Sequence, residues 1–153
     1  MIDVGTGSGA IAVTLAVELG ASVVATDIST AALKVAQVPA SVAADLLTAI
    51  ADESFDVVVS NPPYVPIGDR ESMQREVRDW EPHIALFAGA DGLDIYRRLI
   101  PEAWRVLKPG GLLALEIGIG QADSVTALMR DWSSIEIAPD LAGIPRVVSC
   151  EKP

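Results

Sequence analysis

Residues 1–10 read MIDVGTGSGA, and the order of residue types in this stretch decides the fold. Met1–Val4 reads as the end of a strand and leads into a loop in which three of five residues are glycine, and a stretch with helical spacing, Ala10–Leu19, follows. Gly20 stands where a glycine commonly ends a helix. A glycine loop that leads from a strand into a helix can bind a negatively charged group at the helix N-terminus. The segment therefore predicts the first strand–loop–helix unit of an α/β fold.

Apolar strands and helical stretches alternate along the rest of the chain. Phe55–Ser60 is the clearest strand, because its three consecutive valines are typical of a strand buried on both faces. We expect further strands at residues 21–26, 39–44, 112–117, 134–138 and 146–150, a small hairpin strand at 85–87 and a turn at 109–111. We expect helices at residues 29–37 (capped by Ser29), 46–50, 92–107 (kinked at Pro101) and 121–131. This alternation predicts a mainly parallel sheet with helices on both faces, which binds ligands at the carboxyl ends of its strands.

Composition and charge exclude several classes of protein. The chain has 153 residues, half of them apolar, and a formal net charge of −10, which suits one packed domain that we expect to be a monomer. An acidic chain without a Lys/Arg cluster argues against nucleic-acid binding, which needs clustered cations. We expect no membrane association, because no apolar run approaches the roughly 20 residues that span a bilayer. The single cysteine, Cys150, excludes an internal disulfide and favours a reducing cytoplasm, and no Cys/His spacing suggests a metal site.

The glycine loop by itself leaves three interpretations open. Gly5, Gly7 and Ala10 fit the dinucleotide fingerprint, with Asp27 near the distance at which an acid binds ribose hydroxyls. The same unit could bind an adenosyl ligand that has no pyrophosphate, or it could be a tight turn that binds nothing. Asp27 and Asp45 each follow a strand, so each could cap the next helix. Alternatively, Asp27 could accept from both ribose hydroxyls and Asp45 from the adenine amine, with Leu46 beside the ring.

The tetrapeptide Asn61-Pro62-Pro63-Tyr64 follows the clearest strand and separates these interpretations. Two consecutive prolines exclude a helix and remove two backbone donors, so the segment is a rigid extended turn. The side-chain oxygen of Asn61 and a proline carbonyl could accept both hydrogens of a planar NH2 group, while Tyr64 packs over its plane. This positioning would aim a poorly nucleophilic nitrogen at a methyl group on a sulfonium. Because hydride transfer does not need such a turn, the turn favours S-adenosylmethionine over a nicotinamide cofactor.

Several segments of the chain resemble one protein family. They are Asp3–Gly9, Asn61–Val65, Glu81–Leu93, Glu116–Gly118 with Gln121, and Asp140–Arg146. These segments resemble class I methyltransferases that act on planar nitrogen, and among them the release-factor-specific protein-(glutamine-N(5)) methyltransferases, the HemK/PrmC family. The glycine loop is common to class I methyltransferases, whereas NPPY followed by EPHIAL and GADGL is much more specific. The resemblance covers nearly the whole chain.

The resemblance implies a Rossmann-like class I fold with an antiparallel C-terminal strand. It implies that the protein uses S-adenosylmethionine to methylate the glutamine amide in the Gly-Gly-Gln motif of peptide chain release factors, without a metal. It also implies that Asn61, Pro62, Pro63 and Tyr64 bind the glutamine amide. The residues that it implies for cofactor binding are Asp3, Gly5, Thr6, Gly7, Ser8, Gly9, Asp27, Ile28, Asp45, Leu46 and Asn61.

The domain organisation and three other functions complete these expectations. Residues 1–153 are expected to form a single catalytic domain, without the N-terminal helical domain that helps this family to bind the release factor. Only 17 residues separate Asp27 from Asp45, an interval in which the family is usually longer. The alternatives are glutamine methylation of a ribosomal protein, methylation of an exocyclic amine on a base flipped out of nucleic acid, and S-adenosylmethionine binding without turnover.

Overall fold

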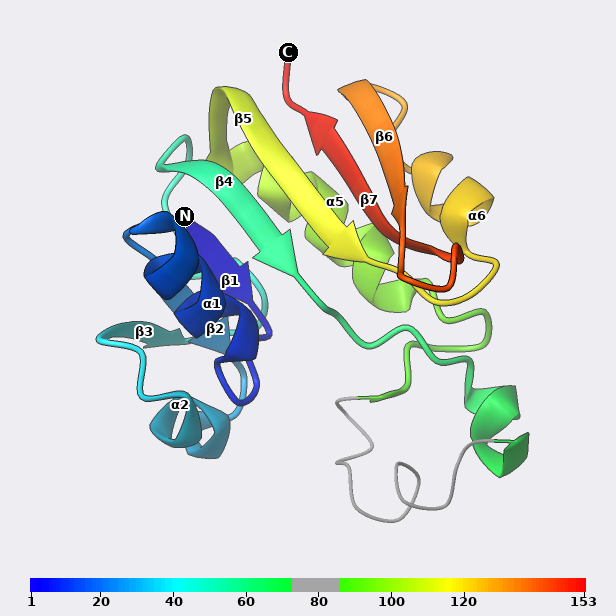
Figure 1. The fold of residues 1–153 in the computed structure, drawn as a ribbon, viewed down its shortest axis with the longest axis horizontal. Coiled ribbons are helices and arrows are strands. Elements are labelled where there is room, and N and C mark those ends of the chain that lie inside the picture. Colours follow the sequence, from blue (N-terminus) through cyan, green and yellow to red (C-terminus); the bar gives the residue numbers. More distant parts are fainter. Residues whose placement is uncertain (73–85) are drawn as a thin grey trace.

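One sheet forms the centre of the protein in a computed structural model, which describes residues 1–72 and 86–153 (Figure 1). Within that part of the chain the sheet has seven strands in the order β3-β2-β1-β4-β5-β7-β6. The strands are β1 (Ile2–Val4), β2 (Val24–Asp27), β3 (Ala40–Ala43), β4 (Phe55–Ser60), β5 (Leu107–Glu116), β6 (Ser133–Pro139) and β7 (Pro145–Glu151). The first five strands pair in parallel, whereas β7 is antiparallel to both β5 and β6. The mainly parallel sheet and its antiparallel C-terminal strand are therefore confirmed.

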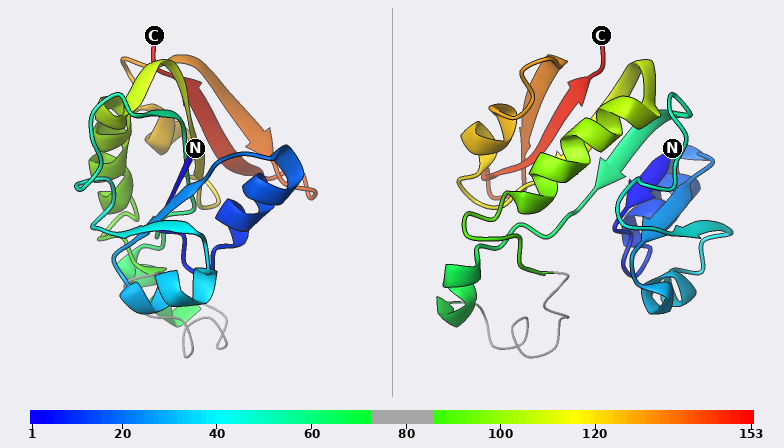
Figure 2. Two further views of the ribbon diagram at one scale, coloured as in Figure 1. Left: turned by 90° about the vertical axis from the view of Figure 1, so that its left-hand side faces the viewer. Right: turned by 180° about the vertical axis from the view of Figure 1, so that it is seen from behind.

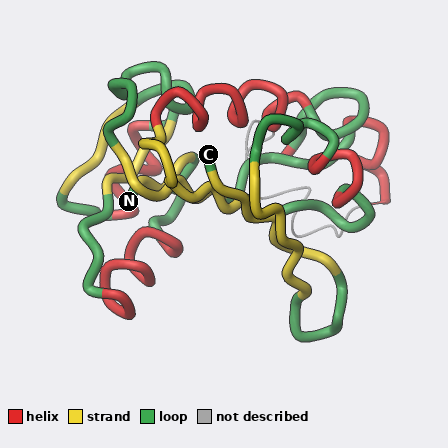
Figure 3. The backbone as a smooth tube through the Cα atoms, turned by 90° about the horizontal axis from the view of Figure 1, so that it is seen from above, coloured by secondary structure: helices red, strands yellow, loops and turns green. Residues whose placement is uncertain are grey.

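Helices cover both faces of this sheet, as the alternating sequence predicts. α1 (Ala10–Leu19) lies on one face, and α5 (Asp94–Val106) and α6 (Ala122–Thr126) lie on the other (Figures 2 and 3). α2 (Thr30–Ala36) packs beside β2 and β3, and a 3-10 helix, η1 (Ile67–Ser72), follows the segment after β4. No helix in the described part of the chain combines the length and the apolar character needed to cross a membrane.

The main core lies between α5 and the sheet. α5 buries residues spaced three or four apart, such as Tyr96 and Leu99, in the same cluster as inward residues of the strands, such as Leu113. Burying one leucine stabilises the fold by about 1.5–3 kcal/mol relative to leaving it exposed. A smaller apolar cluster lies beneath α1 and includes Ala12 and Ala25. Packing on both faces explains why the strands read as continuous apolar runs.

The expected helix at residues 46–50 was wrong, because contacts with α5 replace helical hydrogen bonds there. Leu46 has a φ of 52°, which no α-helix contains, and the segment is a turn. Leu47 donates its N–H to Glu102 at 2.8 Å, and its carbonyl accepts from Arg105 at 2.9 Å. Side chains of α5 thus hold Leu47, while the N–H groups of Thr48 and Ile50 bond within the turn to the carbonyls of Asp45 and Leu47.

Three other elements differ from expectation. Residues 109–111 lie within β5, where pairing with β4 is irregular, and hydrogen bonds between Gly110, Gly111 and Lys152 keep them in the sheet. The helix expected to reach residue 131 ends at Thr126. Ala85 of the expected hairpin strand lies outside the described residues, and Phe87 forms one parallel bridge with Val65, which is not a hairpin pairing.

The short interval between Asp27 and Asp45 accommodates both a helix and a strand. α2 occupies seven residues of it and β3 occupies four. Gln37 ends α2 in a left-handed conformation with φ of 52°, which lets the chain reverse within three residues and begin β3 at Ala40. The compact connection places residue 45 at the same edge of the sheet as the glycine loop.

Candidate active site

The parallel register brings the ends of four strands together at one edge of the sheet, the lower edge in Figure 1. Val4 at the end of β1 pairs with Thr26 of β2 and with Ser60 of β4, and Ser60 also pairs with Leu115 of β5. The next residues along these strands are Gly5, Asp27, Asn61 and Glu116. The glycine loop and the Asn-Pro-Pro-Tyr turn, predicted separately, are therefore neighbours.

The glycine loop adopts backbone conformations that favour glycine. Gly5, Gly7 and Gly9 have φ values of 66°, 54° and 84°. A Cβ atom at Gly9 would lie 2.8 Å from the Cβ of Ala36, so this glycine allows α1 and α2 to approach closely. In contrast, a Cβ at Gly5 or Gly7 would meet no atom within 4 Å. The loop is therefore closed against α2 at one end and open where a ligand could lie.

Asp3 is a buried carboxylate that links the glycine loop to the start of α1. Its side chain is buried, and its Oδ2 accepts hydrogen bonds from Thr6 Oγ1 at 2.6 Å and from the N–H of Ala12 at 3.0 Å. Its Oδ1 has no hydrogen-bond partner among the described residues. Burial raises the pKa of Asp3 above its ordinary value, because the charged form loses its hydration. Asp3 thus organises the start of α1 and keeps one acceptor oxygen unsatisfied.

Asp27 ties the glycine loop to β2. Its Oδ2 accepts from the N–H of Gly7 at 2.9 Å, and its Oδ1 accepts from the N–H of Ser29 at 2.8 Å. The helix cap is Ser29, as predicted, since its hydroxyl accepts from the N–H of Ala32 at 3.2 Å. Asp27 is therefore not the cap of α2, and the exposed side chain of Ile28 lies next to it in the chain.

Asp45 also has a partner within the protein. Its Oδ2 lies 2.7 Å from a guanidinium nitrogen of Arg98 on α5, and both side chains are about half exposed. The neighbouring Leu46 packs against the main core. The ion pair fixes the direction of the Asp45 carboxylate at this edge of the sheet.

The Asn61–Tyr64 turn begins where β4 is fastened to β1. Ser60 donates its hydroxyl hydrogen to the carbonyl of Val4 at 2.7 Å, in a buried position. Asn61 is exposed, Pro62 is buried, and Pro63 and Tyr64 are half-buried. An exposed amide side chain on a fixed strand end can accept hydrogen bonds from a ligand.

Three side chains that received no role from the sequence surround Tyr64. Its hydroxyl donates to Glu116 Oε1 at 3.2 Å and accepts from Arg146 at 3.0 Å, and its carbonyl accepts from Gln121 Nε2 at 3.0 Å. Arg146 also lies 3.0 Å from Glu116 Oε1. The three residues belong to segments that the resemblance includes, but only the position of Glu116 at the end of a buried strand signals a site. The hydrogen bond that Arg146 donates to the Tyr64 hydroxyl is the main cause that raises the pKa of Arg146, so this group stays charged.

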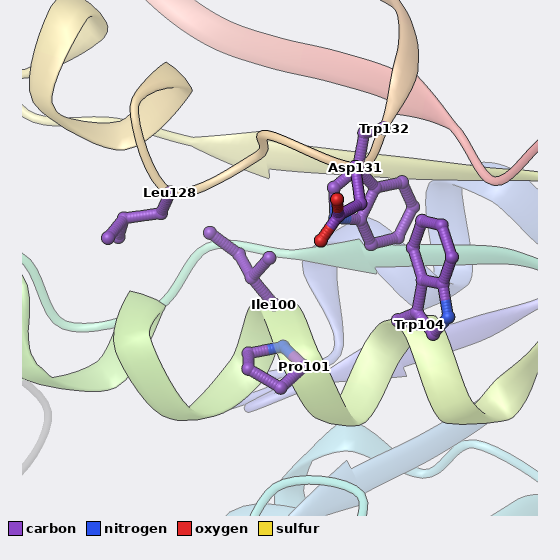
Figure 4. Close-up of a pocket in the computed structure, with 6 residues that line it drawn as sticks. All are labelled: Ile100, Pro101, Trp104, Leu128, Asp131 and Trp132. Carbon is purple, nitrogen blue, oxygen red and sulfur yellow. The ribbon is translucent and has the colours of Figure 1, made fainter.

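Two cavities in the described part of the chain lie away from these residues. One, of about 260 Å³, is lined by Ile100, Pro101 and Trp104 of α5 and by Leu128, Asp131 and Trp132 after α6 (Figure 4). The other, of about 460 Å³, lies between α1 and the starts of β2 and β3. Neither contains a pair of ionisable side chains. Across the described residues, no group of three or more His, Cys, Asp or Glu side chains could hold a metal ion.

The chain is similar to known methyltransferases. A family model described as a methyltransferase domain matches residues 2–78. The chain is 49% identical over 163 residues to a release factor glutamine methyltransferase of Koribacter versatilis, and 43% identical over 159 residues to one of Geobacter sulfurreducens. These alignments cover 100% and 97% of this chain but 58% and 56% of the relatives. The chain thus spans little more than half the length of the curated relatives it matches.

A solved structure has a similar fold over nearly the whole chain. It is the Mtq2–Trm112 complex of E. cuniculi, described as responsible for the methylation of the translation termination factor eRF1. The TM-score is 0.71 at 29% sequence identity, and the match covers 99% of this chain and 84% of that one.

Proposed function

The chain belongs to the methyltransferase domain family, and on this basis we propose that it transfers a methyl group from S-adenosylmethionine to the side-chain amide nitrogen of a glutamine. The acceptor that we propose is the glutamine of the Gly-Gly-Gln motif in a peptide chain release factor, a class of substrate that the names of the similar relatives contain. The observation that carries the proposal is the position of the Asn61–Tyr64 turn. The turn follows β4, which pairs directly with β1, and the open glycine loop follows β1.

The residues at the strand ends fit S-adenosylmethionine. The space above Gly5 and Gly7 leaves room for a ligand against the backbone from Gly5 to Gly9, which includes Thr6 and Ser8. The buried Oδ1 of Asp3 lacks a partner among the described residues, and buried polar atoms of this kind normally bind a ligand or a water molecule. Each oxygen of Asp27 accepts one hydrogen bond and has two lone pairs, so the carboxylate can still accept from ribose hydroxyls.

The remaining cofactor contacts that we propose lie beside these. Asp45 and Leu46 would border the adenine, and Ile28 would pack against the adenosyl group with its exposed side chain. When bound, S-adenosylmethionine supplies a methyl group on a positively charged sulfur. Asn61 could contact both the cofactor and the acceptor, because it follows the strand next to β1.

The turn supplies acceptors for the glutamine amide. The side-chain oxygen of Asn61 and the carbonyl of Pro62 would each accept one N–H of the amide, which fixes the plane and the direction of its nitrogen. Methylation would place the methyl group on the amide nitrogen in place of one hydrogen, which would leave as a proton to solvent. The two acceptors stabilise the positive charge that develops on nitrogen. The buried Pro62 and the neighbouring Pro63 keep the corner rigid, and Tyr64 would pack over the amide plane.

Mass spectrometry of a release factor tests this proposal. The factor is incubated with the chain and S-adenosylmethionine, and we expect a gain of one methyl group on the glutamine of the Gly-Gly-Gln motif. A release factor with alanine at that glutamine should gain none. Lys108→Gln is the matched control for the enzyme, because it removes an exposed ion pair with Asp56 at the opposite edge of the sheet.

The alternatives predict different outcomes in the same experiment. Methylation of a ribosomal protein, but not of the release factor, would move the substrate to that protein. Methylation of RNA or DNA would indicate an exocyclic amine as acceptor, with an affinity that falls as salt rises. Cofactor binding by calorimetry, without transfer to any of these acceptors, would indicate a domain that binds S-adenosylmethionine without turnover.

A further inference from the structure

The Asn61–Tyr64 turn has few backbone groups that could hold it in place. Pro62 and Pro63 have no N–H, so neither can donate a hydrogen bond to a neighbouring strand. Within the described residues, the side-chain hydrogen bonds to this turn all reach Tyr64. They join Tyr64 to Glu116, Gln121 and Arg146, which we call the Tyr64 anchor.

The Tyr64 anchor uses the full hydrogen-bonding capacity of the phenol. The hydroxyl donates its hydrogen to Glu116 and accepts from Arg146, and these two groups also pair with each other at 3.0 Å. The hydroxyl is therefore occupied, and the guanidinium carbon of Arg146 also lies over the Tyr64 ring, 5.5 Å from its centre.

The ion pair in the anchor is better shielded than the surface pairs of this protein. The side chains of Arg146 and Glu116 are 24% and 30% exposed, whereas those of Lys108 and Asp56 are 46% and 74% exposed. Because screening by water weakens exposed pairs most, the shielded pair holds its geometry more firmly. The buried hydroxyl of Tyr96 also donates to the backbone carbonyl of Glu116 at 2.7 Å, which fixes that end of β5.

Two glycines let the surrounding elements close on Tyr64. A Cβ atom at Gly92 would lie 2.3 Å from the Tyr64 carbonyl oxygen, and one at Gly118 would lie 3.1 Å from the ring atom Cδ2. A side chain at Gly92 would therefore collide with the Tyr64 carbonyl, and one at Gly118 would crowd the Tyr64 ring. Tyr64 is thus enclosed by the segment before α5, the end of β5, the start of α6 and β7.

These contacts point to a role that rests on the proposed function. We infer that Arg146 and Glu116 are positioning residues, which hold Tyr64 and through it the Asn61–Pro62 corner where the glutamine amide binds. The antiparallel strand β7 then contributes to the site directly, since it carries Arg146 to a residue 82 positions earlier in the chain. The glycine loop follows β1 and Asp27 ends β2, so loss of the anchor should affect acceptor binding and leave the cofactor bound.

A double-mutant cycle between Tyr64 and Arg146 tests this inference. Arg146→Gln should lower kcat for release-factor methylation by about 10- to 100-fold, the size expected from a displacement of about 1 Å at the reacting groups. Tyr64→Phe keeps the ring and loses the hydroxyl, so it should lower kcat to a similar extent. In the Tyr64→Phe background, Arg146→Gln should cause less than about a threefold further loss, because the shared contact is already absent. Arg146→Lys, which keeps a charged donor, should recover part of the activity.

Cofactor affinity and the Lys108→Gln control separate positioning from general stability. The dissociation constant of S-adenosylmethionine should change less than about threefold in Arg146→Gln. In Lys108→Gln, both this dissociation constant and kcat should stay near the values of the original chain. An equal loss of kcat from Arg146→Gln in both backgrounds would show that the ion pair only joins β5 to β7. An unchanged kcat would also overturn the inference.

Hydrogen exchange gives a readout that does not need catalysis. The N–H of Val65, directly after the turn, bonds to the carbonyl of Leu86 at 2.9 Å. Its exchange should be at least about tenfold faster in Arg146→Gln if the anchor holds the turn, while that of the buried Val58 in β4 stays unchanged. Equal exchange at Val65 would contradict the inference. If the original chain methylates no release factor but exchange at Val65 responds, the proposed function fails and the anchor remains.

Discussion

At the scale of single residues, the candidate site uses side chains that link one strand end to the next. Asp27 accepts from Gly7 and from Ser29, so one carboxylate joins β2 to the glycine loop. Ser60 similarly joins β4 to β1 through the carbonyl of Val4. The residue types were evident from the sequence, since both are polar residues at the ends of apolar strands. The partners Gly7 and Val4 were not evident, because each lies far from its partner in the chain.

Asn61→Ala should separate turnover from cofactor binding. The side-chain oxygen of Asn61 is proposed to hold one N–H of the amide and to stabilise charge on its nitrogen. Removing one such group typically costs about 10²–10³-fold in kcat. The measurement is the initial rate of methyl transfer, with cofactor affinity determined by calorimetry on the same sample. Comparable losses in rate and in affinity would contradict the role that we propose for Asn61.

Asp3→Asn should reveal the cost of burying a charged carboxylate. Because burial raises the pKa of Asp3 above 3.8, the folded protein binds this proton more tightly than the unfolded chain does. The contribution of Asp3 to stability therefore falls as the pH rises from about 3.8 to the raised pKa, and it is constant above that value. The free energy of unfolding in urea is measured for the original chain and for Asp3→Asn across this pH range. The value of the variant relative to that of the original chain should increase as the pH rises. A difference that is independent of pH would show that the pKa is not raised.

At the scale of elements, hydrogen bonds from distant segments decide two elements that the local sequence predicts differently. The Pro-Gly-Gly stretch at residues 109–111 reads as a turn, yet hydrogen bonds with Lys152 keep it inside β5. Residues 46–50 have helical composition, yet side chains of α5 hold the backbone of Leu47 in a turn. Local sequence predicted the boundaries of strands such as Phe55–Ser60 well, because polar residues precede the strand and an Asn-Pro-Pro turn follows it. It failed where a distant element supplied the hydrogen bonds.

Gly92→Ala should disturb the turn, and Gly110→Ala provides a matched control. Both glycines have positive φ, 75° and 74°, so both substitutions cost roughly 1–2 kcal/mol of backbone strain. Only at Gly92 would the new Cβ collide, at 2.3 Å from the Tyr64 carbonyl oxygen, whereas Gly110 has open space. We expect Gly92→Ala to lower the unfolding free energy by about 1–3 kcal/mol more than Gly110→Ala, and to reduce methyl transfer. Equal unfolding free energies would contradict this close packing.

At the scale of the whole molecule, the two halves of the sheet carry the residues proposed for the cofactor and those proposed for the acceptor. The strands β1, β2 and β3 carry the loop and the carboxylates proposed for the cofactor, while β4, β5 and β7 carry the turn and two residues of the Tyr64 anchor, Glu116 and Arg146. The boundary between β1 and β4 brings the two sets together through the pairing of Val4 with Ser60. A sheet that is packed by α5 on one face keeps both halves in register.

Cys150 should report the unfolding of the whole sheet. It lies in β7, is fully buried, and burial raises the pKa of its thiol to about 12. The thiolate that reacts with disulfide reagents is therefore nearly absent from the folded protein at pH 8. We expect labelling only in urea, with a midpoint that matches the loss of far-ultraviolet circular dichroism. Rapid labelling without urea would show that β7 opens independently.

The sequence by itself determined the strand–glycine–helix unit, the mainly parallel sheet and the identity of the Asn-Pro-Pro-Tyr turn. These features depend on residues close together in the chain, whose spacing and backbone preferences are local properties. Only the tertiary structure decided which strand ends are neighbours, that Asp45 pairs with Arg98, and that Arg146 and Glu116 meet at Tyr64. The physical reason is that these contacts join residues far apart in the chain, and those of Arg98 with Asp45 and of Tyr64 with Glu116 and Arg146 span more than 50 positions. Packing of whole elements sets such distances, and no local pattern encodes them.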